Sequence, residues 1–327
     1  MRPFLIKLTR FVVPILLGLY LLGLAVEYKL YRNTRELYYV RQADWHLYHR
    51  KKIKALFIGN SRTSTQVNLP ALVDSFKEPM YCLGQDARRL DILWVKFKKY
   101  LERNPAPKVV VLQIDVSSTL NEGMNMSTFF GKERYLTYLF GDQLGINYLF
   151  KEEEGFFWYE TIIPLIRFIP YPDYFDMYWR KRFTDPYAPP ANYGIFLNPY
   201  KPENKLKPLN EESIVKGEFN IYNTSAILLN HIDSFAQFCQ REHIKLIGVF
   251  PPQSYVSYKK SKSDSMALYI ADYAQKRGVI YRDFNDPCYQ HDSLFYNHIH
   301  VNERGARIYT NHLHAFLDSI GFRAWIR

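Results

Sequence analysis

The chain has 327 residues, of which 47% are hydrophobic, so it can bury a large core and is not a disordered protein. Its formal net charge is +11, but Lys and Arg are spread along the whole chain and form no basic stripe with interleaved stacking aromatics. We therefore expect no nucleic-acid partner. The positive charge fits a surface beside an anionic membrane or an acidic polymer better.

The first targeting feature lies at residues 1–30, where we expect a membrane anchor. Arg2, Lys7 and Arg10 precede an uncharged apolar run at 11–26, and a positive flank of this kind stays on the cytoplasmic side. The run is short for a span, which usually needs about 17–25 residues. A cleaved signal peptide is the alternative, because Gly23-Leu24-Ala25 resembles a small-x-small cleavage site. We expect residues 31–52 to form a helical stalk.

Five short apolar runs then alternate with amphipathic stretches. Continuous rather than alternating apolar runs are typical of strands that are covered on both faces. The alternation predicts an α/β fold: a three-layer sandwich around a mostly parallel five-stranded sheet, with active-site residues at the carboxyl ends of its strands. The predicted strands are 54–59, 80–84, 108–114, 245–250 and 279–284, and the predicted helices 68–77, 87–103, 221–243, 263–277 and 303–319.

Residues 119–219 interrupt this alternation. They contain dense aromatic clusters, such as Phe156-Phe157-Trp158-Tyr159, and a structureless loop of that length is improbable inside a compact domain. We expect an inserted lid or subdomain there, between a first part of the α/β domain at 53–118 and a second part at 220–327. Its aromatic residues suit a groove for an extended ligand, although they could equally pack the core of the insert.

The three cysteines indicate neither a metal site nor a disulfide framework. Cys82, Cys239 and Cys288 are far apart and odd in number, and Cys239 falls on a predicted helix as a core residue. A disulfide between Cys82 and Cys288 stays an alternative. We expect no metal and no cofactor.

A serine follows the first predicted strand. Ser61 lies in Gly59-Asn60-Ser61-Arg62-Thr63, where backbone N–H groups at a helix start could stabilise an oxyanion. Such turns are common and serine is a frequent helix cap, so this motif alone is weak.

A histidine occupies the equivalent place near the other end of the chain. His300 lies between the last predicted strand and the last helix, which Asn302 could cap. The two loops meet at one edge of a parallel sheet, so Ser61 and His300 could form a nucleophile and its general base. The alternatives are surface histidines, or a weak metal cluster with His291 and His298 whose spacing matches no familiar zinc pattern.

Together these motifs resemble the SGNH/GDSL hydrolase superfamily. Order, spacing and strand context agree over about 53–118 and 243–320. The family's first block, Gly-Asp-Ser-x-Thr, is similar to residues 59–63, and the glycine of its second block is similar to Gly84. Its third block is similar to residues 113–116, and its final block, Asp-x-x-His-x-Asn, is similar to residues 297–302.

The resemblance implies a flavodoxin-like sheet and an acyl-enzyme on Ser61, with His300 as base. It places Asn297 where the family has the aspartate that orients the histidine, and it implies oxyanion-hole donors at Ser61, Gly84 and Asp115. Two departures stand out. Asn297 carries no charge to stabilise an imidazolium. Asp115 replaces an amide, so either it is protonated, or it has another role and Ser117 or Ser118 faces the site.

Within the superfamily the chain looks most like the anchored envelope branch, similar to alginate O-acetylation proteins and the D-alanylation transferase subunit. That resemblance implies a single-pass protein of the cytoplasmic membrane whose C-terminal domain faces the periplasm or exterior. It implies an acyl-ester hydrolase or O-acyltransferase acting on cell-envelope or extracellular polysaccharide, with a membrane-bound O-acyltransferase as a possible partner. The alternative is a catalytically decayed SGNH domain that binds a polysaccharide or assembles with such a transferase.

Overall fold

The computed structural model describes residues 2–33, 52–84, 90–115, 226–255, 258 and 263–327. The helix α1 (Arg2–Asn33) belongs to one compact unit and the α/β elements belong to another. The expected insert at 119–219 and most of the expected stalk at 31–52 lie outside the described residues, so both stay predictions.

The helix α1 is long and apolar enough to cross a membrane. Its segment Ile6–Ala25 has 20 residues and a mean hydropathy of 2.0, and it carries exposed apolar side chains such as Phe11 and Leu16. Twenty residues at 1.5 Å each span about 30 Å, the thickness of a bilayer's hydrocarbon core. Length and composition therefore allow the predicted anchor, as they would allow a signal sequence, and the orientation stays a prediction.

The α/β unit is built on a parallel sheet in the order β2-β1-β3-β4-β5. All four neighbouring pairs run parallel, so the prediction of a five-stranded, mostly parallel sheet is confirmed. The strands are β1 (Ala55–Ile58), β2 (Met80–Cys82), β3 (Val109–Gln113), β4 (Lys245–Phe250) and β5 (Ile280–Asp283). Each lies within two residues of its predicted apolar run.

Alternate strand residues face opposite layers of helices, as a period of two requires. On one face, Phe57, Cys82, Val111 and Val249 belong to a core shared with α4, α13 and α14. On the other face, α5 and α10 pack through rings such as Phe97 and Phe235, whose centroids are 5.5 Å apart. The helix bounds are α4 (Leu69–Phe76), α5 (Leu90–Arg103), α10 (Ala226–Arg241), α12 (Ser263–Gln275), α13 (Glu303–Ser319) and α14 (Phe322–Ile326).

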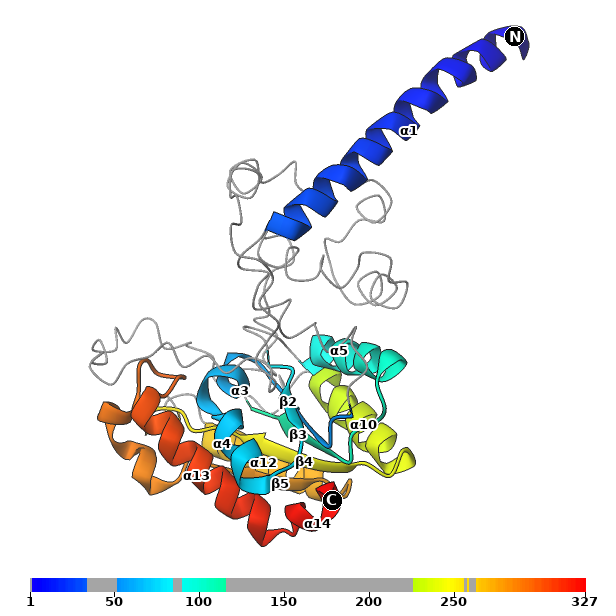
Figure 1. The fold of residues 1–327 in the computed structure, drawn as a ribbon. Helices are drawn as coiled ribbons and strands as arrows, with labels where there is room; N and C mark the ends of the chain where they lie inside the picture. The colour runs from blue at the N-terminus through cyan, green and yellow to red at the C-terminus, as the bar shows by residue number, and fades with distance from the viewer. Residues whose placement is uncertain (1, 34–51, 85–89, 116–225, 256–257, 259–262) are drawn as a thin grey trace. The chain divides into compact units, whose positions relative to one another are not determined.

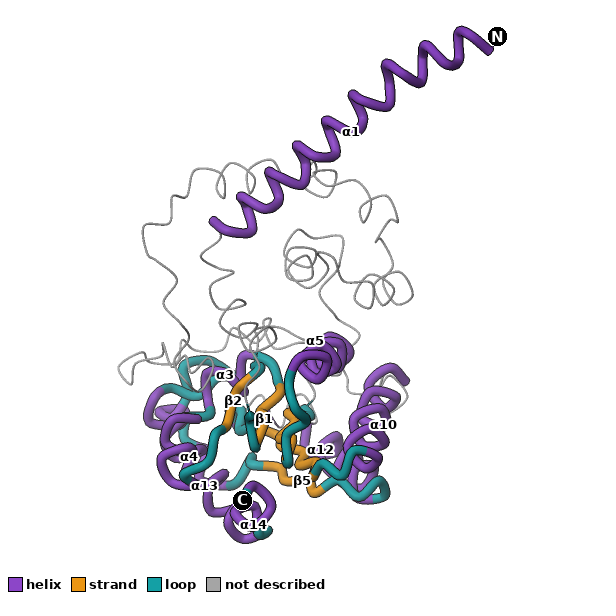
Figure 2. The backbone as a smooth tube through the Cα atoms, turned by 45° about the vertical axis from the view of Figure 1, so that its right-hand side comes forward, coloured by secondary structure: helices purple, strands orange, loops and turns teal. Residues whose placement is uncertain are grey.

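Figures 1 and 2 show these two helical layers on either side of the sheet, which confirms the three-layer sandwich. The helix α12 lies with α10, because the Tyr273 hydroxyl donates a hydrogen bond to Asp233 at 2.9 Å. Cys239 is buried in α10 as expected, and the thiols of Cys82 and Cys288 are free.

The chain reverses its direction across the sheet between β1 and β3. It passes from β1 outward to β2 on one side, then crosses to β3 and continues through β4 to β5. In open parallel sheets the crevice at such a switch point, at the carboxyl ends of the strands, is where ligands usually bind. The short helix α3 (Ser61–Gln66) begins there, directly after β1, and brings Ser61 to this edge.

Candidate active site

Ser61 is the first residue of α3. Asn60 caps the helix: its side-chain oxygen accepts a hydrogen bond from the Arg62 N–H at 2.9 Å. Residues 62–66 are buried, whereas Ser61 is partly exposed. Within the described part of the chain, the Ser61 N–H donates no hydrogen bond. The turn therefore presents one hydroxyl and a nearby backbone donor at the sheet edge.

The turn before Ser61 requires glycine for space. A Cβ atom on Gly59 would collide with the Thr63 hydroxyl and would lie 2.6 Å from the Gln113 side-chain oxygen. Those two groups are themselves hydrogen-bonded at 2.6 Å. The missing side chain at Gly59 lets α3 fold back against the end of β3.

His300 lies in a tight loop before α13, closed by an antiparallel bridge between Phe295 and Val301. The side-chain oxygen of Asn297 accepts hydrogen bonds from the backbone N–H groups of Ile299 and His300, at 3.1 and 2.9 Å. This loop fixes where the imidazole points. Asn302 then caps α13, as predicted, by accepting a hydrogen bond from the Gly305 N–H at 3.0 Å.

The structure brings Ser61, His300 and Asn297 together. The Nε2 atom of His300 lies 2.8 Å from the Ser61 Oγ, and its Nδ1 atom lies 3.1 Å from the Asn297 Oδ1. Because two backbone N–H groups already identify that Asn297 atom as the acceptor, Nδ1 must carry the proton and donate it. Nε2 is then unprotonated and accepts the hydrogen bond of the serine hydroxyl. This is the tautomer that a general base requires.

Burial keeps the imidazole neutral. It is the largest cause that lowers the pKa of His300 to about 4, and the positive charge of Arg62 lowers that pKa further, while Asp115 raises it. A histidine with this pKa is unprotonated at neutral pH. It can therefore accept the serine proton over the whole physiological range.

Gly84 follows β2 and packs against α3. A Cβ atom there would lie 2.9 Å from the backbone nitrogen of Ser64, so only a glycine allows this approach. The Gly84 N–H donates to the Cys82 sulfur at 3.2 Å. Burial raises the pKa of that thiol to about 11, so it stays neutral and is a weak acceptor.

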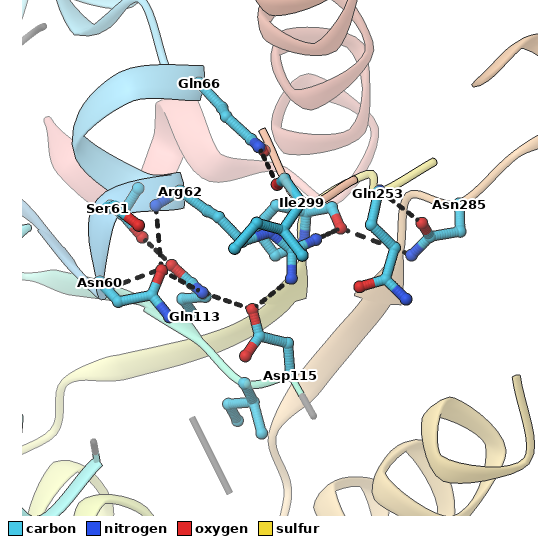
Figure 3. A network of polar contacts seen from close by, with 12 residues as sticks. Asn60, Ser61, Arg62, Gln66, Gln113, Asp115, Gln253, Asn285 and Ile299 are labelled. Atoms are coloured by element: carbon cyan, nitrogen blue, oxygen red, sulfur yellow. Dashed lines mark hydrogen bonds and ion pairs between the residues drawn. The ribbon is translucent and has the colours of Figure 1, made fainter. Parts of the chain in front are cut away.

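Asp115 has a different arrangement from the one that an oxyanion-hole donor needs. Its carboxylate is fully buried and lies 2.6 Å from the guanidinium of Arg62, and it also accepts a hydrogen bond from the Gln113 side chain (Figure 3). A carboxyl group whose oxygen accepts from a guanidinium and from an amide faces two donors rather than an oxyanion. The alternative that Asp115 has another role is therefore the one that the geometry favours. Ser117 and Ser118 lie outside the described residues.

Gln113 connects the two halves of this network. Its side-chain oxygen accepts from the Asn60 N–H at 3.2 Å, and its side-chain nitrogen donates to the Asn60 Oδ1 at 2.8 Å and to Asp115 (Figure 3). The helix cap before Ser61 and the carboxylate after β3 are thus held by one amide.

The histidines of the loop after β5 do not gather a metal site. Among the described residues, no group of three His, Cys, Asp or Glu side chains could hold an ion. His298 instead accepts, through its backbone oxygen, a hydrogen bond from the Ser254 N–H at 2.9 Å. That contact joins the loop after β4 to the loop that carries His300.

A contact between a serine and a histidine is not diagnostic by itself. Ser75 Oγ and His314 Nε2 lie 2.6 Å apart on the exposed sides of α4 and α13. Ser75 lies near the end of α4 and not at the start of a helix at the sheet edge. What distinguishes Ser61 and His300 is the combination of a buried imidazole, a fixed tautomer and a backbone donor beside the hydroxyl.

The chain was compared with family models, curated proteins and solved structures. No protein-family model matches the chain, and no curated protein matches it. Among solved structures, it is similar to a protein from Bacteroides fragilis described as a "putative acylhydrolase", with 13% identity, a TM-score of 0.41 and coverage of 90% of this chain and 98% of that one.

Sequence reasoning missed Arg62 and Gln113 as parts of the site. A signal was present for Gln113, because a polar residue that ends a run of four apolar strand residues must find a buried partner. Gln113 and Asp115 are also two residues apart, the spacing that places side chains on the same side of an extended chain. The partner of Asp115 lies 53 positions away and has no local signal.

Proposed function

We propose that this protein is a serine-dependent acyl-ester hydrolase or O-acyltransferase that works through an acyl-enzyme on Ser61. The observation that carries the proposal is the 2.8 Å contact between the His300 Nε2 and the Ser61 Oγ, with the opposite ring nitrogen fixed by Asn297. A serine is activated when its hydroxyl is hydrogen-bonded to a base and a third group orients that base through a second hydrogen bond.

The reaction follows from these three side chains. The Ser61 Oγ attacks the ester carbonyl while the His300 Nε2 takes the hydroxyl proton, and the carbonyl oxygen becomes an oxyanion beside the Ser61 N–H. The imidazolium then gives its proton to the leaving alkoxide, the ester C–O bond breaks and an acyl-serine remains. We infer that Gly84 N–H is a second oxyanion donor, because it packs against α3 and its present acceptor is weak.

A molecule that accepts the acyl group completes the cycle. It gives its proton to His300 and attacks the acyl-serine, and Ser61 recovers its proton when it leaves. Water as acceptor releases a free acid, whereas a sugar hydroxyl yields a new ester. The candidate span in α1 favours a site at a membrane surface, and we propose cell-envelope or extracellular polysaccharide as the substrate class, with the domain on the outer side.

Covalent labelling tests this proposal. We expect the full chain, purified in detergent, to be labelled by a fluorophosphonate, and Ser61→Ala and His300→Ala to abolish labelling. Ser75→Ala is the matched control, because it removes a serine that contacts a histidine at 2.6 Å elsewhere in the same unit. It should label like the wild type.

An unlabelled wild-type chain, or equal labelling of Ser61→Ala, would exclude the acyl-enzyme. The alternative of a decayed domain that binds polysaccharide or a membrane O-acyltransferase would then take its place. A labelled chain that turns over an activated acetyl ester would instead be tested for acetyl transfer to glycan hydroxyls against transfer to water.

A further inference from the structure

Arg62 is a deeply buried cation that directly follows the candidate nucleophile in the chain. Its side chain is 1% exposed. One terminal nitrogen lies 2.6 Å from the Asp115 carboxylate, the other donates to the Pro251 carbonyl oxygen, and the guanidinium carbon lies 5.4 Å from the centre of the Phe250 ring. The Arg62 side chain, which comes from the helix after β1, therefore contacts the segment after β3 and the segment after β4.

The pair is electrostatically necessary once either charge is present. Burying a carboxylate or a guanidinium without its partner costs several kcal/mol, because each loses its hydration. A lone Asp115 carboxylate would carry a further disadvantage, since it would oppose the negative charge that forms at the substrate oxygen beside Ser61. The guanidinium removes both problems at once.

We propose that Arg62 and Asp115 act as one charge-balancing pair for the Ser61–His300 dyad, in which the Arg62 guanidinium neutralises the buried Asp115 carboxylate beside the site. This inference rests on the proposed function. Both residues act through Ser61 and His300 rather than on the substrate, so we regard them as positioning residues.

The pair also affects the base. Two charged groups act on His300 from the elements around it: Arg62 on α3 lowers the pKa of His300, and Asp115 after β3 raises it, in addition to the larger effect of burial. Tyr309 on α13 and Asp283 on β5 interact with Arg62 as well. Removal of Arg62 and removal of Asp115 should therefore shift the acid limb of the reaction in opposite directions.

The test is a double-mutant cycle in the full chain in detergent. The variants are Arg62→Met, Asp115→Asn and the double variant, with Arg307→Met as the control, because Arg307 makes an exposed ion pair with Glu303 at 3.4 Å. Fluorophosphonate labelling is measured as a function of pH, and thermal unfolding is measured in parallel.

We expect Arg62→Met to slow labelling at pH 7 by about 10- to 100-fold, the effect of one uncompensated charge several ångströms away at an effective dielectric constant of about 20. Its acid limb should move to higher pH, whereas that of Asp115→Asn should move to lower pH. Both single variants should melt earlier than the wild type. The double variant should recover most of the melting temperature and labelling, and Arg307→Met should match the wild type.

The pair is refuted if Arg62→Met labels within threefold of the wild type, if the double variant is no better than Arg62→Met, or if both acid limbs move in the same direction. Should Arg62→Met fail to fold, recovery of a cooperative transition in the double variant decides the question. Failure here is distinct from failure of the proposed function, because an unlabelled wild-type chain overturns the acyl-enzyme itself.

Discussion

Replacing Asn297 by Asp is the sharpest perturbation of the candidate site. The Asn297 Oδ1 lies 3.1 Å from the His300 Nδ1 and already accepts two backbone N–H groups. An aspartate of the same shape keeps these three hydrogen bonds and adds a negative charge beside the imidazole. We therefore expect Asn297→Asp to fold like the wild type and to strengthen the base.

The size of the effect follows from the contact. An opposite charge within about 4–6 Å raises a pKa by about 1–3 units, which moves the pKa of His300 up from about 4 and stabilises its imidazolium by roughly 1.4–4 kcal/mol. If about half of that stabilisation is expressed when the proton is half transferred, the rate rises about 3- to 30-fold.

The assay is the pH dependence of labelling and of ester turnover. The wild type should stay active down to about pH 4, because His300 is neutral above its pKa, and the acid limb of Asn297→Asp should lie about 1–3 units higher. Asn68→Asp is the control, since Asn68 caps α4 through the Ala71 N–H and carries no candidate role. An unchanged rate with an unmoved acid limb would refute the reasoning, because the oxygen at position 297 would then not face Nδ1.

Three further outcomes are expected. Burial lowers the pKa of His300 from 6.5 to about 4, so the unfolded chain binds a proton that the native chain lacks. Between pH 7 and pH 4 the wild type should therefore lose about 3 kcal/mol of unfolding free energy relative to His300→Gln. Urea titrations in which both proteins show the same pH dependence of that free energy would contradict this. Gly59→Ala should lower the free energy of unfolding by about 1–3 kcal/mol and abolish labelling, because the new Cβ atom would collide with Thr63 and Gln113. An unchanged melting temperature would contradict this close packing. A periplasmic alkaline phosphatase reporter fused after residue 60 should be active, and activity of a cytoplasmic reporter at that point instead would reverse the expected topology.

Most of the sheet was predictable because β1 to β4 are largely continuous apolar runs, whereas β5 (Ile-Tyr-Arg-Asp) is only partly buried. Ala55–Ile58 and Val109–Gln113 are buried along their whole length, and such runs bounded by polar segments have few other interpretations. The proximity of Ser61 and His300 was predictable because each follows a recognisable element and parallel strands bring their carboxyl ends to one edge; their catalytic roles stay predictions. The 2.8 Å contact between them depends on loop geometry that the sequence pattern does not encode.

The helix α3 could not be predicted from periodicity. Its sequence, Ser-Arg-Thr-Ser-Thr-Gln, contains no apolar residue, yet five of its six residues are buried. The segment is helical because Asn60 caps it and because Arg62, Thr63 and Gln66 have partners from other parts of the fold. Tertiary hydrogen bonds replace the apolar face on which sequence reasoning depends.

The large separation between Ser61 and His300 has a consequence for biosynthesis. The two residues are 239 positions apart, and the loop that carries the base is followed by α13, which supplies part of the core behind β1. A chain still emerging from the ribosome contains Ser61 long before His300, so the two side chains cannot meet until translation has passed the loop before α13. The proposed dyad would therefore form only after α13 has been synthesised and has packed against the sheet, late in the synthesis of this domain.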